Sequence, residues 1–237
     1  MKRRYIAIAS ALTLSMSCVT AFAAPSAAPA APSASGATVN AQSTSSEVPL
    51  PYPTQYVVQP GDTMFKIAQQ VGVSLAALEA ANPQIKNFNV IWPGMTIRLP
   101  LTAHQQKVNA ILATAVSLIG TPYQWGGDQP QTGFDCSGFV AYVYAQNGII
   151  LPRTSHDQAT VGTPVAIRDL APGDLIFLAD TYPNAWPNHV THVGIYAGNG
   201  SMIESTSVAN RGVVLVRNIF QSSYYMSHYW GARRVIP

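Results

Sequence analysis

A cysteine at the start of a helical pattern is the residue of this 237-residue chain with the strongest signal for chemistry. Cys136 lies in the segment GFDCSGFV at 133–140, and apolar residues then recur at helical spacing until Gly148 gives a stop signal. At a helix N-terminus, unpaired N–H groups and the positive end of the dipole favour the thiolate. The segment therefore predicts a nucleophilic Cys136, with its own N–H and that of Ser137 available to an oxyanion.

His192 is the best candidate for the base that such a nucleophile requires. It lies in the segment THVGIY at 191–196, which has the pattern of a strand. With a period of two, His192 faces away from Val193 and Ile195, and Gly194 leaves room beside it. We therefore expect the imidazole to be free to reach the thiol.

The other histidines have weaker claims to this role. His189 precedes His192 by three residues and is the main competitor, but its loop position fixes it less well. The remaining three lie in a joint or in polar stretches and are His104, His156 and His228. One cysteine among scattered histidines does not have the spacing of a metal site, so we expect no metal and no cofactor.

The N-terminus has the three parts of a secretory signal peptide. Positive residues precede an apolar run at 5–19 that is too short to cross a bilayer, and AFA at 21–23 is a cleavage site. Residues 1–23 are therefore expected to be removed from an exported protein of the periplasm or cell wall. Cys18 lacks the aliphatic residue that a lipobox has three positions earlier, so we do not expect a lipoprotein.

Loss of residues 1–23 changes the charge and the cysteine count. The full chain has a formal charge of +3 and two cysteines, and the leader carries three basic residues and one of those cysteines. A near-neutral chain does not favour nucleic acid, and a single cysteine cannot form an internal disulfide. The alternative is that Cys136 is a buried side chain that only packs in the core. The oxidising compartment favours a thiol with a chemical function over this packing role. Residues 24–54, rich in Ala, Pro and Ser, predict a disordered linker.

Residues 55–100 have the pattern of a small βααβ domain, with two short strands around two capped helices. YVVQPGDT at 56–63 and PGMTI at 93–97 resemble the LysM module. The resemblance implies binding of glycans that contain N-acetylglucosamine, through the loop after the first strand and the loop before the second. The implied residues are Gly61, Asp62, Thr63, Met64, Asn82, Pro83 and Ile85. Several of them are also ordinary turn and cap residues, and that alternative stays open.

Residues 105–237 predict a larger domain of the α+β class. An apolar stripe over 105–119 predicts a helix, which the helix at Cys136 follows. Strand patterns come later, at 175–178, 191–197, 201–204, 213–216 and 229–235. GNG at 198–200 is typical of a hairpin, and helices followed by strands indicate an antiparallel sheet.

Ordered motifs across this domain resemble the NlpC-type cell-wall cysteine peptidases, whose fold is papain-like. They are GTPYQWGG at 120–127, FDCSGFV at 134–140, LPR at 151–153, PGDL at 172–175, HVGIYAGNG at 192–200 and ARR at 232–234. The resemblance implies a hydrolase of peptidoglycan stem peptides, typically acting between D-γ-glutamate and the diamino acid.

The same resemblance implies roles for single residues. Cys136 is the nucleophile, and His192 is the general base and later the general acid. The implied substrate contacts are Tyr123 near the oxyanion, Asp135 and Ser137 beside the substrate, and Arg153 and Ser155 along the groove. Packing and turn support are the alternatives for Tyr123 and Arg153.

One position departs from the family pattern. The residue that orients the histidine lies twelve positions after it and is usually His, sometimes Asn or Gln, but it is Glu204 here. We expect its carboxylate to accept the His192 N–H and to stabilise the imidazolium. A Glu204 side chain directed at solvent or substrate would instead indicate a weak or altered site.

These patterns together predict an exported, monomeric wall hydrolase in which 55–100 holds the glycan and 105–237 cuts the peptide through a thioester. Its expected partner is peptidoglycan, with no nucleic acid and no membrane segment after leader removal. Two alternatives stay open: an amidase or transpeptidase acting on another bond, and a wall-binding scaffold without activity. The loop at 180–188 is a candidate gate of the groove.

Overall fold

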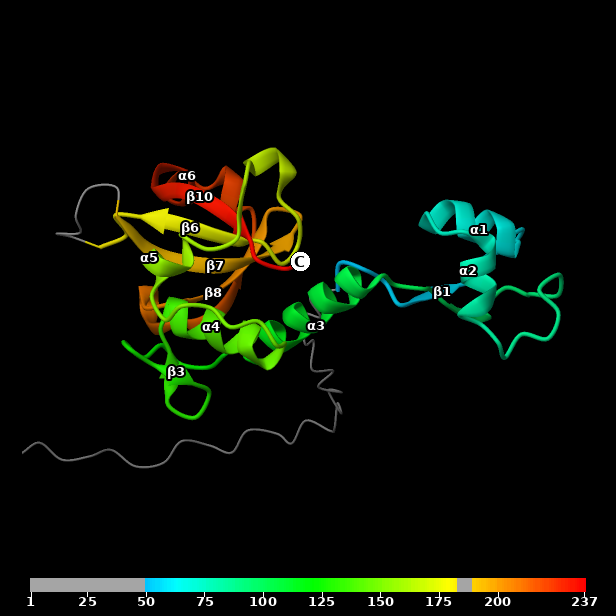
Figure 1. Ribbon diagram of the computed structural model, residues 1–237, viewed down its shortest axis with the longest axis horizontal. Coiled ribbons are helices and arrows are strands. Elements are labelled where there is room, and N and C mark those ends of the chain that lie inside the picture. The colour runs from blue at the N-terminus through cyan, green and yellow to red at the C-terminus, as the bar shows by residue number, and fades with distance from the viewer. Residues whose placement is uncertain (1–49, 183–188) are drawn as a thin grey trace, which may run out of the picture. The chain divides into compact units, whose positions relative to one another are not determined.

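The computed structural model describes residues 50–182 and 189–237 (Figure 1). The expected signal peptide, almost all of the linker and positions 183–188 of the candidate gate lie outside these ranges. Among the helices of the two ranges, none combines the length and apolar character needed to cross a bilayer.

The first domain has the predicted βααβ order. Its elements are β1 (Gln55–Val57), α1 (Met64–Val71), α2 (Leu75–Ala80) and β2 (Thr96–Arg98), with β1 antiparallel to β2. Thr63 caps α1 by accepting from the Lys66 N–H, and Ser74 caps α2 in the same way. A compact apolar cluster that includes Ile67, Leu78 and Ile97 holds the four elements together.

The second domain begins with α3 (Ala103–Ser117), two residues earlier than its apolar stripe suggested. The reason is a capping box: Thr102 accepts from the Gln105 N–H while the Gln105 side chain accepts from the Thr102 N–H. The short strands β3 (Asp128–Gln129) and β4 (Gly133–Phe134) follow, and α4 (Cys136–Gln146) starts at the cysteine as predicted.

A six-stranded antiparallel sheet completes this domain and confirms the α+β class. Its order is β5-β10-β6-β7-β8-β9. The strands are β5 (Thr163–Val165), β6 (Leu175–Ala179), β7 (Val190–Gly198), β8 (Ser201–Thr206), β9 (Gly212–Val216) and β10 (Tyr229–Arg234). The remaining helices are α5 (Ser155–Gln158) and α6 (Ser223–His228), and the 3-10 turns are η1 (Ile167–Asp169), η2 (Val208–Asn210) and η3 (Ile219–Gln221). The patterns used above did not predict β5, α5 or α6.

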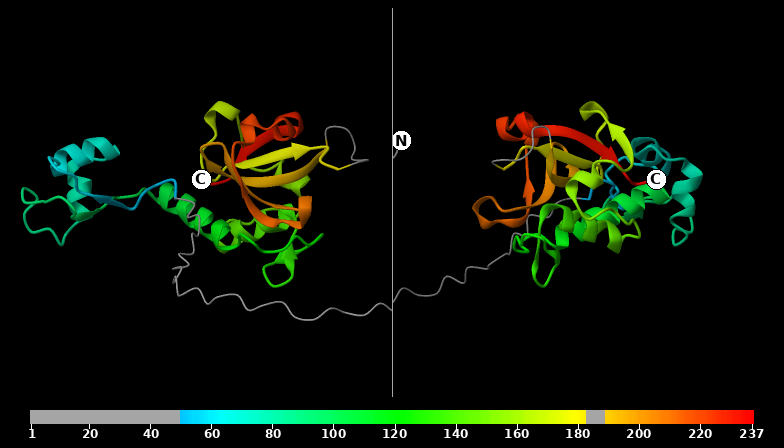
Figure 2. Two further views of the ribbon diagram at one scale, coloured as in Figure 1. Left: turned by 180° about the vertical axis from the view of Figure 1, so that it is seen from behind. Right: turned by 60° about the vertical axis from the view of Figure 1, so that its left-hand side comes forward.

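The sheet is buried on both faces because its strands alternate between two apolar clusters. Phe177 and Val193 belong to the cluster that α4 covers, whereas Leu178 and Tyr196 belong to the cluster beside α6. Figure 1 and the two turned views in Figure 2 show α4 and α6 on opposite sides of the strands. A catalytic side chain on α4 can therefore meet residues of the sheet where α4 begins.

A glycine at the start of β9 fixes the segment that leads to Tyr123. Gly212 has a φ of 68°, and a Cβ there would lie 2.0 Å from the Thr121 carbonyl oxygen. The Val213 N–H donates to that same oxygen at 2.8 Å. Only glycine allows this approach of the two backbones without strain.

Gly212→Ala is expected to lower the free energy of unfolding by at least about 2 kcal/mol, because it combines left-handed strain with a backbone clash. Thermal and urea unfolding measure the change. Gly231→Ala is the matched control, since a Cβ at Gly231 meets no heavy atom within 4 Å. Equal unfolding midpoints for the two variants would contradict the assigned role of Gly212.

Candidate active site

Cys136 occupies the first position of α4, as its sequence context predicted. The Asp135 side chain caps the helix by accepting from the Gly138 N–H at 2.6 Å. The first backbone bond of the helix runs from the Phe139 N–H to the Asp135 carbonyl oxygen, so the Cys136 and Ser137 N–H groups are not used by it. Cys136 is 9% exposed, and its sulfur lies 3.9 Å from the Thr191 carbonyl oxygen. It is therefore sheltered at the positive end of a helix and next to β7.

A hydroxyl on β8 fixes the start of α4 against the sheet. The buried Ser205 Oγ donates to the Phe134 carbonyl oxygen at 2.7 Å, two residues before the nucleophile. Since Ser205 follows Glu204 directly, this bond fixes the backbone just before Cys136 relative to the strand that carries the Glu204 carboxylate.

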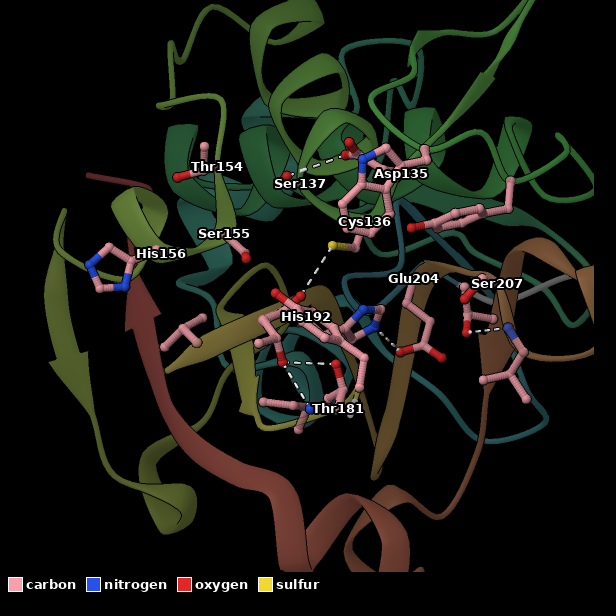
Figure 3. Close-up of a pocket in the computed structure, with 18 of the residues that line it drawn as sticks. Asp135, Cys136, Ser137, Thr154, Ser155, His156, Thr181, His192, Glu204 and Ser207 are labelled. Atoms are coloured by element: carbon pink, nitrogen blue, oxygen red, sulfur yellow. Dashed lines mark hydrogen bonds and ion pairs between the residues drawn. The ribbon is translucent and has the colours of Figure 1, made fainter. Parts of the chain in front are cut away.

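His192 and Glu204 form a close contact across β7 and β8. His192 Nε2 lies 2.7 Å from Glu204 Oε2, and the two side chains are 14% and 4% exposed. Figure 3 shows the Cys136 thiol, the imidazole and the carboxylate converging on one site. The carboxylate therefore points at the histidine and does not face solvent.

The charges of this group shift its titration. Burial alone would lower the pKa of His192, but the Glu204 charge and a hydrogen bond with Cys136 outweigh it and raise that pKa to about 10. Burial would raise the pKa of Glu204, but the His192 charge and hydrogen bonds from His192 and Tyr225 lower it. The pair therefore favours an imidazolium beside a carboxylate, which is the partner that a thiolate needs.

Tyr225 is a member of this site that the sequence patterns missed. Its hydroxyl donates to Glu204 Oε1 at 2.7 Å, so each carboxylate oxygen has its own donor. Burial and the charge of Glu204 raise the pKa of Tyr225, which keeps it a donor. Tyr225 lies in α6, an element without an amphipathic signal, and its distance of 21 residues from Glu204 has no motif attached to it.

Arg153, Asp135 and Ser137 form a second polar group at the start of α4. Arg153 makes two bonds to the Asp135 carboxylate, at 2.7 and 2.9 Å, and donates to Ser137 Oγ at 3.1 Å. Its remaining bond goes to the Gly127 carbonyl oxygen. The hydrogen bonds with Asp135, with a smaller effect of its charge, raise the pKa of Arg153 further, so this ion pair persists wherever the carboxylate is ionised.

Tyr123 lies near the thiol in the same cleft. A bridge to Phe134 holds its backbone, and its side chain lines the same cleft as Cys136. Burial, with smaller effects of the Cys136 and Asp135 charges, raises its pKa to about 12. The phenol is therefore a hydrogen-bond donor at neutral pH.

These groups line one cleft of about 1240 Å³. The cleft exceeds the usual range for one small ligand and suits an extended chain. Ser155 is buried in its wall, and His156 stacks on His189 at a centroid distance of 4.5 Å. His189, the competing candidate for the base, thus lies in the cleft wall. His192 is the histidine that contacts Glu204.

The two remaining histidines lie elsewhere. His104 Nδ1 lies 2.9 Å from the Pro237 carbonyl oxygen, and the His228 ring packs on Tyr224. Across the part of the chain that the structure describes, no three His, Cys, Asp or Glu side chains are arranged to hold a metal.

Burial changes the interpretation of the expected glycan contacts. Met64, Asn82 and Ile85 are buried in the first domain, so their side chains are not available to a glycan. Asn82 instead joins the end of α2 to β2, with bonds to the Leu78 and Arg98 backbones. The expectation is corrected for these three side chains. The other four are exposed or half-buried and are Gly61, Asp62, Thr63 and Pro83.

Asp62 also has a local structural role. Its carboxylate accepts from the Gln59 N–H at 2.7 Å and from the Tyr56 hydroxyl at 2.8 Å, which holds the loop between β1 and α1.

Comparison with known proteins identifies both domains. The NlpC/P60 family model matches residues 120–234, and the LysM domain model matches residues 56–100. The Bacillus subtilis protein named bifunctional muramidase/DL-endopeptidase CwlT is 40% identical over 106 residues, or 45% of this chain and 31% of that protein. Murein DD-endopeptidase MepH of Escherichia coli is 36% identical over 141 residues, or 56% of this chain and 49% of that protein. Matches to these curated relatives therefore span less than half of their length.

A solved structure agrees with these matches. An NLP/P60 family protein of Staphylococcus aureus, described as similar to lipoprotein, superposes with a TM-score of 0.51 at 33% identity. The superposition covers 59% of this chain and 44% of that one. The chain thus carries a LysM domain and belongs, through its cysteine-containing domain, to the NlpC/P60 family of cysteine peptidases.

Proposed function

We propose that this protein is a peptidoglycan hydrolase, a cysteine D,L-endopeptidase that cleaves stem peptides between D-γ-glutamate and the diamino acid. The observation that carries the proposal is Cys136 at the N-terminus of α4 with the His192–Glu204 pair beside it. Family membership supports the same class of reaction. The protein acts after export, at the periplasmic or outer face of the wall.

The reaction that this geometry supports begins with attack of the Cys136 thiolate on the amide carbonyl carbon. The His192 imidazolium then gives its proton to the leaving amine, and a thioester remains on the sulfur. Water, deprotonated by His192, attacks the thioester and releases the acid and the free thiol. In this proposal the Cys136 and Ser137 N–H groups, with the Tyr123 hydroxyl in the same cleft, donate to the oxyanion of both steps.

The choice of bond rests on a relative and on the cleft. CwlT, whose name describes a DL-endopeptidase, aligns with this domain at 40% identity. The Arg153–Asp135 pair with Ser137 offers both charges and a hydroxyl beside the nucleophile, which suits a zwitterionic peptide end. Ser155 borders the same part of the cleft.

The LysM domain would hold the enzyme on glycan strands. Its accessible loop residues Gly61, Asp62, Thr63 and Pro83 are the proposed contacts. Binding there is independent of the cysteine, so wall binding and cleavage are separable properties of a protein that we propose to act as a monomer.

Cleavage of another peptidoglycan bond is the second candidate. MepH carries the name of a DD-endopeptidase and matches this chain over a longer stretch than CwlT. Product masses discriminate between the two, because each bond releases different fragments.

Cys136→Ala is expected to abolish release of soluble fragments from purified peptidoglycan, because no other described group can form the thioester. Mass spectrometry of the digests should show stem peptides split after D-glutamate with the unmodified protein alone. The variant should still sediment with wall material. Fragments from a different bond would overturn the bond choice, and absence of fragments with the unmodified protein would overturn the enzyme proposal.

Glu204→Gln is expected to lower kcat/KM by about ten- to hundredfold, the equivalent of one charge-assisted hydrogen bond. Loss of the carboxylate charge lowers the pKa of His192, so the alkaline limb of the pH profile moves to lower pH. Kinetics on a defined muropeptide across pH measure both effects. Glu79→Gln, in the LysM domain, is the control. Unchanged turnover and an unchanged limb would rule out an orienting charge at Glu204.

A further inference from the structure

We propose that Tyr225 is a positioning residue of this site, whose hydroxyl keeps the Glu204 carboxylate ionised and aimed at His192. The catalytic consequence rests on the proposed function, whereas the contact between the two side chains does not. Tyr225 lies outside the motifs that identify the family in this chain, which end at 200 and resume at 232.

Each carboxylate oxygen of Glu204 has a hydrogen-bond donor of its own. Glu204 Oε2 lies 2.7 Å from His192 Nε2, and Glu204 Oε1 accepts from the Tyr225 hydroxyl at 2.7 Å. Two donors on separate oxygens fix the plane of the carboxylate, since rotation about the terminal bond would break both contacts. With one donor alone, the same rotation would cost only one hydrogen bond, so the plane of the carboxylate would be less firmly fixed.

Tyr225 itself is held in place by apolar packing. Its ring packs in the apolar cluster of Ile176, Leu178 and Ile219 on the face of the sheet beside α6. The ring is thus held by packing, and its hydroxyl reaches the polar edge of the same cluster. Glu204 gains a donor whose position does not depend on a flexible surface side chain.

Charges and hydrogen bonds around Glu204 offset the cost of burying its carboxylate. The carboxylate is 4% exposed, and burial alone would favour its protonated form. The groups that face it are His192 from β7, Tyr224 and Tyr225 from α6, and Arg211 before β9, while Cys136 lies beyond the imidazole. His192 and Arg211 act on it through charge, and His192 and Tyr225 donate hydrogen bonds.

Removal of the Tyr225 hydroxyl should therefore make Glu204 a stronger proton acceptor. A hydrogen bond to a charged group corresponds to about one pH unit or more. In Tyr225→Phe the carboxyl should titrate about one unit higher, and the carboxylate should have more freedom to rotate. Protonated Glu204 cannot stabilise the His192 imidazolium. The pH below which the pair of Cys136 thiolate and His192 imidazolium is lost should therefore rise.

Carboxyl ¹³C NMR measures this shift directly, because the chain has three glutamates, Glu47, Glu79 and Glu204. The protein is labelled at the glutamate side-chain carbon and titrated with acid while circular dichroism monitors folding. Glu204→Gln assigns the Glu204 resonance. The expected result is an upward shift of about one unit in Tyr225→Phe.

Tyr229→Phe is the matched control. Tyr229 packs against the same cluster and burial raises its pKa, but its hydroxyl is not among the described partners of Glu204. The control removes the same oxygen atom from the same apolar environment, and Glu204 should titrate as in the unmodified protein. Equal titrations of Glu204 in Tyr225→Phe and Tyr229→Phe would overturn the proposal.

The rate of Cys136 alkylation by iodoacetamide gives a second measurement that needs no substrate. Mass spectrometry of the peptide that contains Cys136 follows the reaction at each pH. Tyr225→Phe should move the acid limb to higher pH, but it should have no such effect in a Glu204→Gln background. An equal effect in both backgrounds would show a packing role and overturn the proposal.

The unmodified protein supplies a further test should Tyr225→Phe fail to fold. Its Glu204 must titrate below the ordinary glutamate value, and a value at or above it would overturn the proposal. Digestion of peptidoglycan separates this inference from the proposed function. A shifted Glu204 without any cleavage by the unmodified protein would keep the role of Tyr225 and sink the endopeptidase assignment.

Discussion

The site depends on the pairing of β7 with β8, because that pairing brings a histidine and a carboxylate into contact. Ile195 lies opposite Ile203 and Tyr196 lies opposite Met202 in this hairpin. By alternation, His192 and Glu204 lie on the same face as Tyr196 and Met202. A slip of one residue would move Glu204 to the other face, away from the imidazole. The separation of twelve residues between the two is thus set by the length of a short hairpin.

The nucleophile reaches this pair through interactions of a different kind. The dipole and free N–H groups of α4 act on Cys136, and the Ser205 hydroxyl ties the preceding Phe134 to β8. Gly212 lets β9 approach Thr121, two residues before Tyr123, which lines the cleft with the thiol. Two contacts between distant segments therefore help to position the nucleophile, and neither of them involves the reacting groups themselves.

Local signals explain what could be predicted from the sequence. The start of α4 at Cys136, the hairpin at 198–200 and the caps Thr63 and Ser74 all follow from residue type and spacing over a few positions. The start of α3 was placed two residues late, because the apolar stripe carried more weight than the capping box at Thr102. Glu204 is a different case: the resemblance to the NlpC-type peptidases, whose orienting residue lies twelve positions after the histidine, identified it as the residue beside His192.

Long-range packing explains what could not be predicted. Tyr225 reaches Glu204 from a short helix whose polar sequence has no periodic stripe, and β5 pairs with β10 from the opposite end of the domain. Asn82 resembled a loop residue, yet its side chain bonds both α2 and β2 in the interior of the LysM domain. In each case the partner is far away in sequence, and no local pattern encodes it.

Glu204 accepts a hydrogen bond on each of its two carboxylate oxygens, and this affects which substitutions the site could accommodate during evolution. Within the family the equivalent position is usually histidine, sometimes asparagine or glutamine, and none of these presents two equivalent acceptor oxygens. The Tyr225 hydroxyl can donate a hydrogen bond to a carboxylate at position 204. If that position held histidine, asparagine or glutamine, the hydroxyl would in many cases face an N–H group instead. Residues 204 and 225 should therefore covary among homologues, with an exchange at one position favouring an exchange at the other.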